Sequence, residues 1–383
     1  MINKNKKIPV FKPKYRTKEN LSALKEIFNS GWTGIGNKTI QFENEWKKFT
    51  GLKNAHFLNS CTAGLHIALL VLKSFYKWKN NSEIITTPIS FVSTSHSILN
   101  SNLKISFCDI DYTGTLDPKK ILQVINKKTK AILFVGLGGS YGNLFKIREI
   151  CRKKKIKLII DAAHMAGSYN GNKHIGSEGD VSIFSFQAVK NLPSADSGII
   201  CFKDKKLDAI SRKISWCGID KDTFTREKKR KSINAWEYDV PLLGYKYHGN
   251  SVIAAIASIS LKYLTKDNRY RTKLSNHYIK KLKENKRIFI VQHSKHSSRH
   301  LFSILVKNRE NLIKVLKKNN IYPGVHYKSI LEFSYYKKIK NLRKTKSMSV
   351  SKKFSREILS LPLHMYLTYK DVGKICKIIN NHA

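Results

Sequence analysis

Short apolar runs alternate with helical patterns of apolar and polar residues between about residue 50 and residue 200. This alternation is typical of βαβ units, in which helices connect the strands of a mostly parallel sheet. Seven strands are predicted, at residues 55–58, 83–86, 104–108, 131–135, 157–160, 181–184 and 199–202. We therefore expect a three-layer α/β domain built around a seven-stranded, mostly parallel sheet.

The pattern changes after residue 250. A strongly apolar helix is predicted at residues 251–264, followed by a smaller α+β unit with a strand at 301–306 and helices at 309–319 and 370–381. Near the start of the chain, apolar residues at helical spacing predict a helix over residues 18–29, which Gly31 ends. We expect an N-terminal arm and a large domain over residues 1–250, and a linking helix with a small C-terminal domain over residues 251–383.

Composition narrows the class of protein. No run approaches the roughly 18 consecutive apolar residues that a membrane-spanning helix requires, and no apolar stretch follows the lysine-rich start. The six cysteines contain no CxxC pair, so we expect reduced, buried thiols, with no disulfide framework and no metal site. These features predict a cytoplasmic protein.

The net charge of +46 is extreme and suggests nucleic acid as a partner. The lysines are, however, spread along the whole chain together with abundant asparagine and isoleucine, which is typical of compositional drift and not of a binding surface. We therefore expect no nucleic acid partner. Attraction of an anionic small substrate, such as a nucleotide-linked sugar, fits the charge better.

The segment from Asn59 to Leu69 follows a predicted strand and opens a helix. Free backbone N–H groups at a helix start, together with the hydroxyls of Ser60 and Thr62, can bind a phosphate dianion. An ordinary serine or threonine N-cap gives the same pattern, so this segment alone does not decide between the two.

Two charged residues follow buried strands of the predicted sheet. Asp161 comes directly after the run Leu158-Ile159-Ile160, at the end of a parallel strand where open α/β sheets bind ligands. Lys190 comes shortly after strand 181–184, and an amine in a partly desolvated position there is nucleophilic. A helix N-cap for Asp161 and a surface position for Lys190 are the alternatives. Together, such a carboxylate and such an amine are the two protein groups that pyridoxal phosphate requires.

An aromatic residue and a few polar ones complete the candidate site. Phe91 lies at another strand-to-helix junction, where its ring could stack on a planar heteroaromatic ring; core packing is the alternative. His164 and Tyr327 have polar tips that could contact a substrate, but neither is informative alone.

These motifs occur in an order that resembles the DegT/DnrJ/StrS family of pyridoxal-phosphate-dependent nucleotide-sugar aminotransferases, which have the type I aspartate aminotransferase fold. The resemblance covers nearly the whole chain. Besides the three site motifs, it includes residues 8–10, 30–36, 42–43, 244–247, 326–327 and 359–364.

The resemblance implies a role for each matching residue. Lys190 would bind the cofactor covalently, Asp161 would pair with its pyridinium nitrogen, and Phe91 would stack on its ring. The other residues implied are Ser60, Cys61, Thr62, Ala63 and Ser185 around the phosphate, His164 and Gln187 near the ring, and His326 and Tyr327 near substrate. A homodimer is also implied, in which residues 245–250, including Asn250, reach the partner's cofactor.

The chain departs from the family pattern around this site. Gln187 stands where the family often has histidine, Ser197-Gly198 stands near a usual pair of glycines, and residues 136–139 and 248–249 also differ. Lys190 is retained, which argues against the dehydratase branch that has histidine in its place. The resemblance therefore supports the type of reaction more strongly than it supports a particular substrate.

The predicted activity is transfer of an amino group from an amino acid, expected to be L-glutamate, to a keto-sugar nucleotide, with pyridoxal phosphate as cofactor. The product would be an amino sugar for a surface polysaccharide such as lipopolysaccharide. Three alternatives stay open: a cyclitol aminotransferase acting on inosose-type ketones, a non-enzymatic regulator that only binds pyridoxal phosphate, and a nucleic-acid-binding protein.

Overall fold

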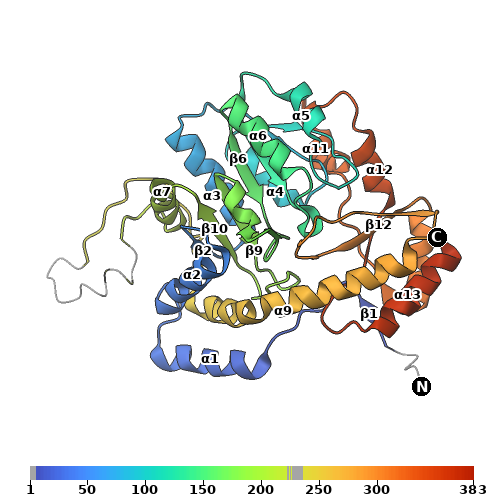
Figure 1. Ribbon diagram of the computed structural model, residues 1–383. Coiled ribbons are helices and arrows are strands. Elements are labelled where there is room, and N and C mark those ends of the chain that lie inside the picture. Colours follow the sequence, from blue (N-terminus) through green and yellow to red (C-terminus); the bar gives the residue numbers. More distant parts are fainter. Residues whose placement is uncertain (1–5, 222–223, 225, 227–235) are drawn as a thin grey trace.

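The computed structural model describes residues 6–221, 224, 226 and 236–383. Its centre is an eight-stranded sheet with the strand order β14-β4-β3-β5-β6-β9-β10-β2. β10 is antiparallel to both of its neighbours, and the other strands run parallel to one another. Helices cover both faces of this sheet (Figure 1), which confirms the predicted three-layer α/β domain.

The strands of the central sheet are β2 (His56–Leu58), β3 (Glu83–Thr86), β4 (Lys104–Phe107), β5 (Thr129–Val135), β6 (Lys157–Asp161), β9 (Val181–Ser185), β10 (Gly198–Phe202) and β14 (Arg343–Lys344). The first seven are the predicted strands, and each end lies within two residues of its expected position. The prediction is one strand short, because β14 consists of two exposed basic residues and carries no apolar signal.

The described helices are α1 (Thr17–Ser30), α2 (Asn37–Thr50), α3 (Cys61–Phe75), α4 (Val92–Asn100), α5 (Pro118–Val124), α6 (Leu144–Lys154), α7 (Lys205–Ser215), α9 (Ser251–Leu282), α10 (Arg309–Lys318), α11 (Ser334–Lys337), α12 (Ser349–Glu357) and α13 (Tyr369–His382). Alternate residues of a central strand face different helical layers. In β6, Leu158 and Ile160 share a core cluster with Trp46 of α2, whereas Ile159 packs in a second cluster with Leu65 of α3. The continuous apolar runs of the sequence are therefore strands buried on both faces.

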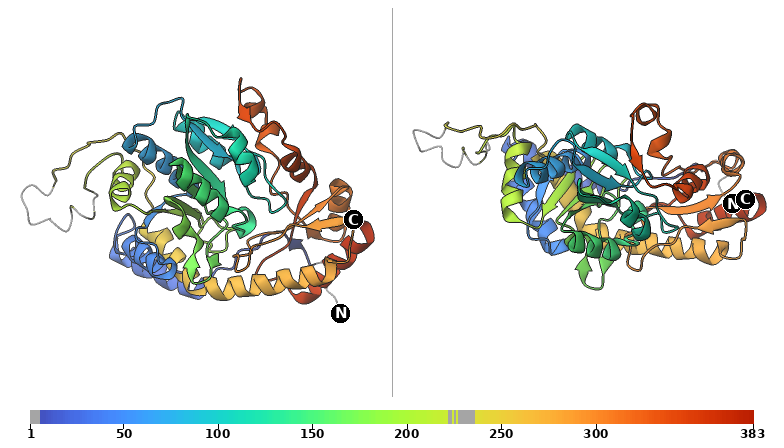
Figure 2. Two further views of the ribbon diagram at one scale, coloured as in Figure 1. Left: turned by 45° about the horizontal axis from the view of Figure 1, so that its top comes forward. Right: turned by 90° about the horizontal axis from the view of Figure 1, so that it is seen from above.

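Most of the C-terminal third forms a smaller α+β unit at one end of the molecule (Figure 2), but β14 joins the central sheet. Its antiparallel sheet contains β11 (Ile288–Ile290), β12 (Phe302–Val306) and β15 (Ile358–Leu361). The start of the chain packs with this unit, because β1 (Ile8–Pro9) pairs with β13 (Ile321–Tyr322). A separate two-stranded hairpin joins β7 (Tyr169–Asn170) to β8 (Lys173–His174).

Helix α9 connects the two units and is much longer than the predicted segment 251–264. Its second half is amphipathic: Leu274, Tyr278 and Leu282 recur every four residues and pack in the core of the small unit. The prediction ended too early because it followed the continuous apolar run and not the single apolar stripe that continues beyond it.

All six cysteines are free thiols. Five are buried as expected, but Cys217 is exposed, because it follows α7 in a turn instead of lying within a strand or helix. In the part of the chain that the structure describes, no helix has an apolar stretch long enough to cross a membrane.

The buried carboxylate of Glu43 ties helix α2 to β2 and α7. Its Oε1 accepts a hydrogen bond from the backbone N–H of Phe57 at 2.8 Å and lies 3.2 Å from His56 Nδ1, and its Oε2 accepts one from Arg212 Nη2 at 3.0 Å. Burial opposes the charged carboxylate, but these partners outweigh it and lower the pKa of Glu43. Glu43 is therefore an anchor of the sheet edge that carries α3.

Glu43→Gln is expected to lower the free energy of unfolding by about 2 kcal/mol at neutral pH, because hydrogen bonds to a buried charged group are lost. The lowered folded-state pKa means that this contribution is present above the ordinary pKa and is lost as pH falls through the folded value. Urea unfolding of both proteins at several pH values should show the difference shrinking in acid. Glu149→Gln, in an exposed pair with Arg152, is the control; a pH-independent difference for Glu43→Gln would contradict the assignment.

Candidate functional site

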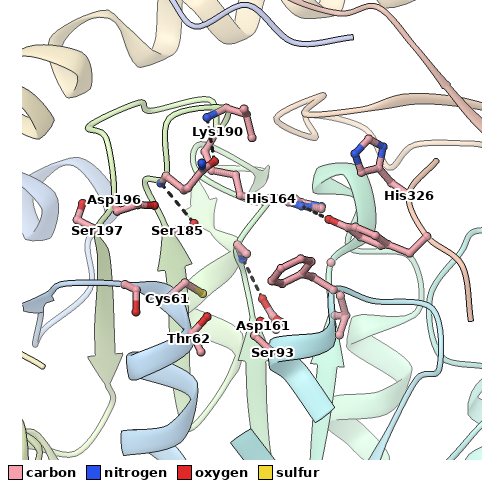
Figure 3. A pocket seen from close by; sticks show the side chains of 18 residues that line it. Cys61, Thr62, Ser93, Asp161, His164, Ser185, Lys190, Asp196, Ser197 and His326 are labelled. Carbon is pink, nitrogen blue, oxygen red and sulfur yellow. Dashed lines mark hydrogen bonds between the residues drawn. The ribbon is translucent and has the colours of Figure 1, made fainter. Parts of the chain in front are cut away.

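A cavity of about 440 Å³ opens at the carboxyl ends of β5, β6 and β9, where open α/β sheets bind ligands. Most of its lining comes from the large domain. From the C-terminal third, Tyr327 and His326 also reach it, and Figure 3 labels His326. The lining residues are Ser60, Cys61, Thr62, Phe91, Ser93, Val135, Gly136, Asp161, Ala163, His164, Ser185, Gln187, Val189, Lys190, Asp196, Ser197, His326 and Tyr327.

The cavity brings together the predicted site residues with two exceptions. Ala63 is buried behind it, and its N–H already donates to Ser60 Oγ at 3.1 Å. Asn250 caps helix α9, where its Oδ1 accepts from the N–H of Ile253 at 3.0 Å, and it does not line the cavity of its own chain. A contact of Asn250 with a partner's cofactor stays a prediction.

Other lining residues were not predicted. Ser93, Ala163 and Val189 lie within two residues of predicted ones, so the same junctions could have indicated them. Val135 ends β5, and its strand-end position is the signal that was overlooked; Gly136 follows it and belongs to the segment 136–139 that departs from the family pattern. Asp196 and Ser197 come from the far side of the turn that carries Lys190; no local pattern marks Asp196, and Ser197 was noted only as a departure from the family pattern. A further residue outside the lining set, Thr94, was missed as a partner of Asp161.

The start of helix α3 forms one end of the cavity. Ser60 is its N-cap and satisfies the N–H of Ala63, so the N–H groups of Cys61 and Thr62 have no acceptor within the helix. Ser185, at the end of β9, adds a buried hydroxyl beside this helix start. Free N–H groups at the positive end of a helix, with nearby hydroxyls, provide the donors that a phosphate group requires.

Gly198 allows this helix start to lie against β10. A Cβ atom at position 198 would lie 2.5 Å from the backbone nitrogen of Cys61 and 2.7 Å from the carbonyl oxygen of Phe184. Both contacts are with backbone atoms, so neither can be relieved by rotating a side chain.

Gly198→Ala is therefore expected to displace the start of α3 and to weaken binding of pyridoxal phosphate roughly tenfold or more, since small displacements of positioning groups have large effects. The dissociation constant can be measured by titrating the cofactor-free protein and following cofactor absorbance. Gly373→Ala, where an added Cβ has no neighbour within 4 Å, is the matched control. Wild-type affinity in a folded Gly198→Ala protein would disprove this role.

Asp161 lies at the end of β6 and is 5% exposed. Its Oδ2 accepts a hydrogen bond from Thr94 Oγ1 at 2.7 Å, and its Oδ1 accepts one from the N–H of Ala163 at 3.2 Å. Burial raises the pKa of Asp161, although these two donors and the charge of Lys190 favour the ionised form. A protonated ring nitrogen placed against this carboxylate would supply the counter-charge that the site requires.

Lys190 approaches the cavity from a different side than Asp161 (Figure 3). Burial lowers the pKa of the Lys190 amine to about 8, even though Cys61 and Asp161 act in the opposite direction. About a tenth of the amine is therefore uncharged at pH 7, far more than for an exposed lysine, and the uncharged form is the nucleophile.

The residue after Lys190 holds the lysine turn in place. The Nδ2 of Asn191 donates to Asn268 Oδ1 and to the carbonyl oxygen of Ser298, both at 2.7 Å. The Oδ1 of Asn191 lies 2.9 Å from His300 Nδ1. These partners lie on α9 and in the loop between β11 and β12, so contacts from the C-terminal third of the chain fix the position of Lys190.

His164 and Tyr327 form a hydrogen-bonded pair at the cavity wall. The Nδ1 of His164 accepts from the backbone N–H of Gly138 at 3.2 Å, and burial lowers the pKa of His164 well below its usual range. The ring is therefore neutral and carries its proton on Nε2, which donates to the Tyr327 oxygen 3.3 Å away. The hydroxyl proton of Tyr327 is then left to donate to another acceptor.

The set of residues fits pyridoxal phosphate. The chain offers a buried amine, a buried carboxylate, an anion-binding helix start and Phe91, whose large ring is 58% exposed beside the cavity. An apolar ring this exposed, at the wall of a cavity, can cover a planar heteroaromatic ring.

Comparisons with known proteins agree with this geometry. The model of the DegT/DnrJ/EryC1/StrS aminotransferase family matches residues 14–380. A UDP-4-amino-4,6-dideoxy-N-acetyl-beta-L-altrosamine transaminase of Campylobacter jejuni is 32% identical, over 91% of this chain and 89% of its own length. A UDP-4-amino-4-deoxy-L-arabinose--oxoglutarate aminotransferase of Shewanella sediminis is 30% identical over 98% of both chains.

Solved structures have the same fold. Helicobacter pylori PseC, an aminotransferase involved in the biosynthesis of pseudoaminic acid, has a TM-score of 0.89 at 27% identity and covers 98% of this chain and 99% of its own. A Streptococcus pneumoniae protein solved in a PLP form has a TM-score of 0.86 at 24% identity over 98% of both chains.

Proposed function

Because the chain belongs to the DegT/DnrJ/EryC1/StrS aminotransferase family, whose members depend on pyridoxal phosphate, we propose that it aminates a keto-sugar linked to a nucleoside diphosphate. The observation that carries the proposal is the cavity itself, which joins Lys190, Asp161 and the open start of α3. Support for the substrate class comes from relatives that are named for UDP-sugars. Support for L-glutamate as donor comes from the oxoglutarate in the name of the Shewanella sediminis relative.

Each residue has a defined task in this proposal. Bound pyridoxal phosphate supplies an electron sink and carries the amino group between the two substrates. Asp161 would balance the charge of the ring nitrogen of the cofactor, and the first turn of α3 would hold its phosphate. The amine of Lys190 would hold the cofactor, and the same amine would take a proton from the α-carbon of the donor as general base and return a proton as general acid.

Tyr327 is proposed to orient the sugar by donating a hydrogen bond to one of its oxygens, because its own oxygen is occupied by His164. Tyr327→Phe removes the hydroxyl and keeps the ring. We expect KM for the keto-sugar to rise roughly tenfold, as for loss of one buried hydrogen bond, with KM for the amino donor unchanged. Steady-state kinetics with each substrate varied in turn measures both values. An equal change in both KM values would argue for general damage to the site.

A homodimer with shared sites is part of the proposal. Residues just before the Tyr245–Asn250 segment expose large apolar side chains, namely Trp236 (70%), Tyr238 (50%), Val240 (54%) and Leu243 (89%). Burial of such a strip against a second copy would remove this apolar surface from water. Light scattering should give twice the mass of the 44.0 kDa chain, and a monomer with full activity would refute shared sites.

The substrate class is tested with purified protein, L-glutamate and a panel of ketones. Activity on keto-sugar nucleotides supports the proposal, and activity only on inosose-type ketones would favour the cyclitol alternative. Cofactor binding without turnover of any donor would favour a regulator. The product would enter a surface polysaccharide pathway, in line with a Bacillus subtilis relative named as a spore coat polysaccharide biosynthesis protein. The free thiols fit a cytoplasmic location.

A further inference from the structure

A second concave surface lies at the opposite edge of the central sheet. Three loops line it at the amino ends of β3, β5 and β6, whereas the candidate site lies at the carboxyl ends. Even a five-residue strand spans roughly 16 Å, so a ligand on this surface would not touch the residues of the candidate site. We call it the lysine groove. Its volume is about 970 Å³, and its 16 lining residues lie within the segments 76–82, 125–130 and 154–157.

The lysine groove is more basic than the rest of the chain. Eight of its 16 lining residues are lysines, and none is acidic. In the whole chain, 72 of 383 residues are lysine or arginine and 26 are acidic. The evenly spread charge that the sequence indicates therefore becomes concentrated when three separate loops meet in the fold.

The positive charge of the groove is largely uncompensated. Lys157 Nζ lies 3.3 Å from Asp180 Oδ1, but no ion pair of the described residues joins any of the other seven groove lysines to a carboxylate. Glu83, at the start of β3, is engaged by Arg343 at 2.6 Å and by Asn126 at 2.9 Å.

Helix ends oppose the lysines only weakly. Helices α3, α5 and α6 all end beside the groove, and each helix end carries about half a negative charge. Three such ends sum to roughly −1.5 charges, which is small against seven lysines without an acidic partner. The groove therefore keeps a strongly positive potential.

Backbone hydrogen bonds hold the three loops in place. The N–H of Trp78 donates to the carbonyl of Lys73 at 2.9 Å, and the N–H of Glu83 donates to that of Lys128 at 2.8 Å. In the third loop, the N–H of Ile156 donates to the carbonyl of Cys151 at 3.0 Å. The lysine side chains thus extend from a fixed frame, which reduces the entropy lost when they gather around an anion.

The two aromatic rings of the groove are already engaged. Lys157 Nζ lies over the ring of Tyr76 at 4.5 Å, and Tyr76 stacks on Trp78 with ring centroids 6.3 Å apart. The groove therefore lacks the open aromatic platforms on which nucleobases stack. What it offers is a row of ammonium point charges, which suits an anion made of repeated phosphates.

From these observations we propose that the lysine groove binds inorganic polyphosphate, a linear anion with neither base nor sugar. This binding is independent of the aminotransferase reaction. It requires no movement of Lys190 or Asp161.

The test compares two triple variants of the cofactor-loaded enzyme with the same net charge. One carries Lys127→Ser, Lys128→Ser and Lys155→Ser in the groove. The control carries Lys280→Ser, Lys281→Ser and Lys377→Ser, which are exposed lysines of α9 and α13 on a different surface. Binding of fluorescent inorganic polyphosphate is measured by anisotropy over a series of salt concentrations.

We expect the groove variant to bind roughly tenfold more weakly or worse, and its slope of log K against log salt to be shallower by about 2. The control should behave like the wild type. Equal losses in the two variants would show that net charge alone attracts the probe, and would overturn the proposal. Tighter binding of single-stranded DNA with the same number of phosphates, or equally tight binding of orthophosphate, would also overturn it.

Discussion

Lys190→Ala is expected to lower kcat by roughly 10³-fold or more, because the variant loses both the covalent attachment of the cofactor and the group that moves the proton. The fold should persist, since the turn that carries Lys190 is held by the amide of Asn191 and not by the lysine amine. The rate of keto-sugar amination under saturating cofactor measures the loss, and circular dichroism checks the fold.

Lys190→Arg is the matched control, because it keeps the positive charge but holds its proton far above neutral pH. If charge alone were needed, the arginine variant would retain activity. We expect it to be as inactive as the alanine variant. Substantial turnover by either variant would exclude Lys190 as the reactive amine.

Asp161→Asn is expected to lower kcat roughly 10²- to 10³-fold, the range found when one preorganised electrostatic partner is removed from a buried site. Asparagine has the same shape, so packing against Thr94 and Ala163 is retained while the negative charge is lost. The affinity for pyridoxal phosphate should also fall. Both quantities can be measured on the same preparation, by steady-state kinetics and by cofactor titration.

Thr94→Val is the graded comparison, because it removes one hydrogen bond to Asp161 and leaves the carboxylate in place. Its effect should be much smaller than that of Asp161→Asn. If Asp161→Asn left kcat and cofactor affinity unchanged, the carboxylate would have only a structural role at the end of β6.

The parts of the fold that the sequence predicts are those with a local signal. The continuous apolar run of β6 predicts a strand buried on both faces, and Asp161 is informative because it ends that strand. Lys190 becomes informative in the same way, through its place after β9. The chemically distinctive residues that follow buried strands therefore predicted most of the candidate site.

The remaining features depend on contacts between distant segments. Asn191 looks ordinary in the sequence, and its importance appears only when α9 and the loop of His300 meet around it. The lysine groove is a similar case, since its three loops are separated by about 25 to 45 residues of chain. Periodicity and motif spacing do not reveal which distant segments contact one another, because neither contains information on tertiary contacts.

The most direct test of the account is to locate the covalent attachment of the cofactor. The purified enzyme is loaded with pyridoxal phosphate, reduced with borohydride, digested with trypsin and analysed by mass spectrometry. Modification of Lys190 blocks cleavage there, so the account predicts a pyridoxyl adduct on the uncut peptide of residues 174–203. An adduct on any other lysine, with residues 174–190 and 191–203 recovered as separate unmodified peptides, would contradict it.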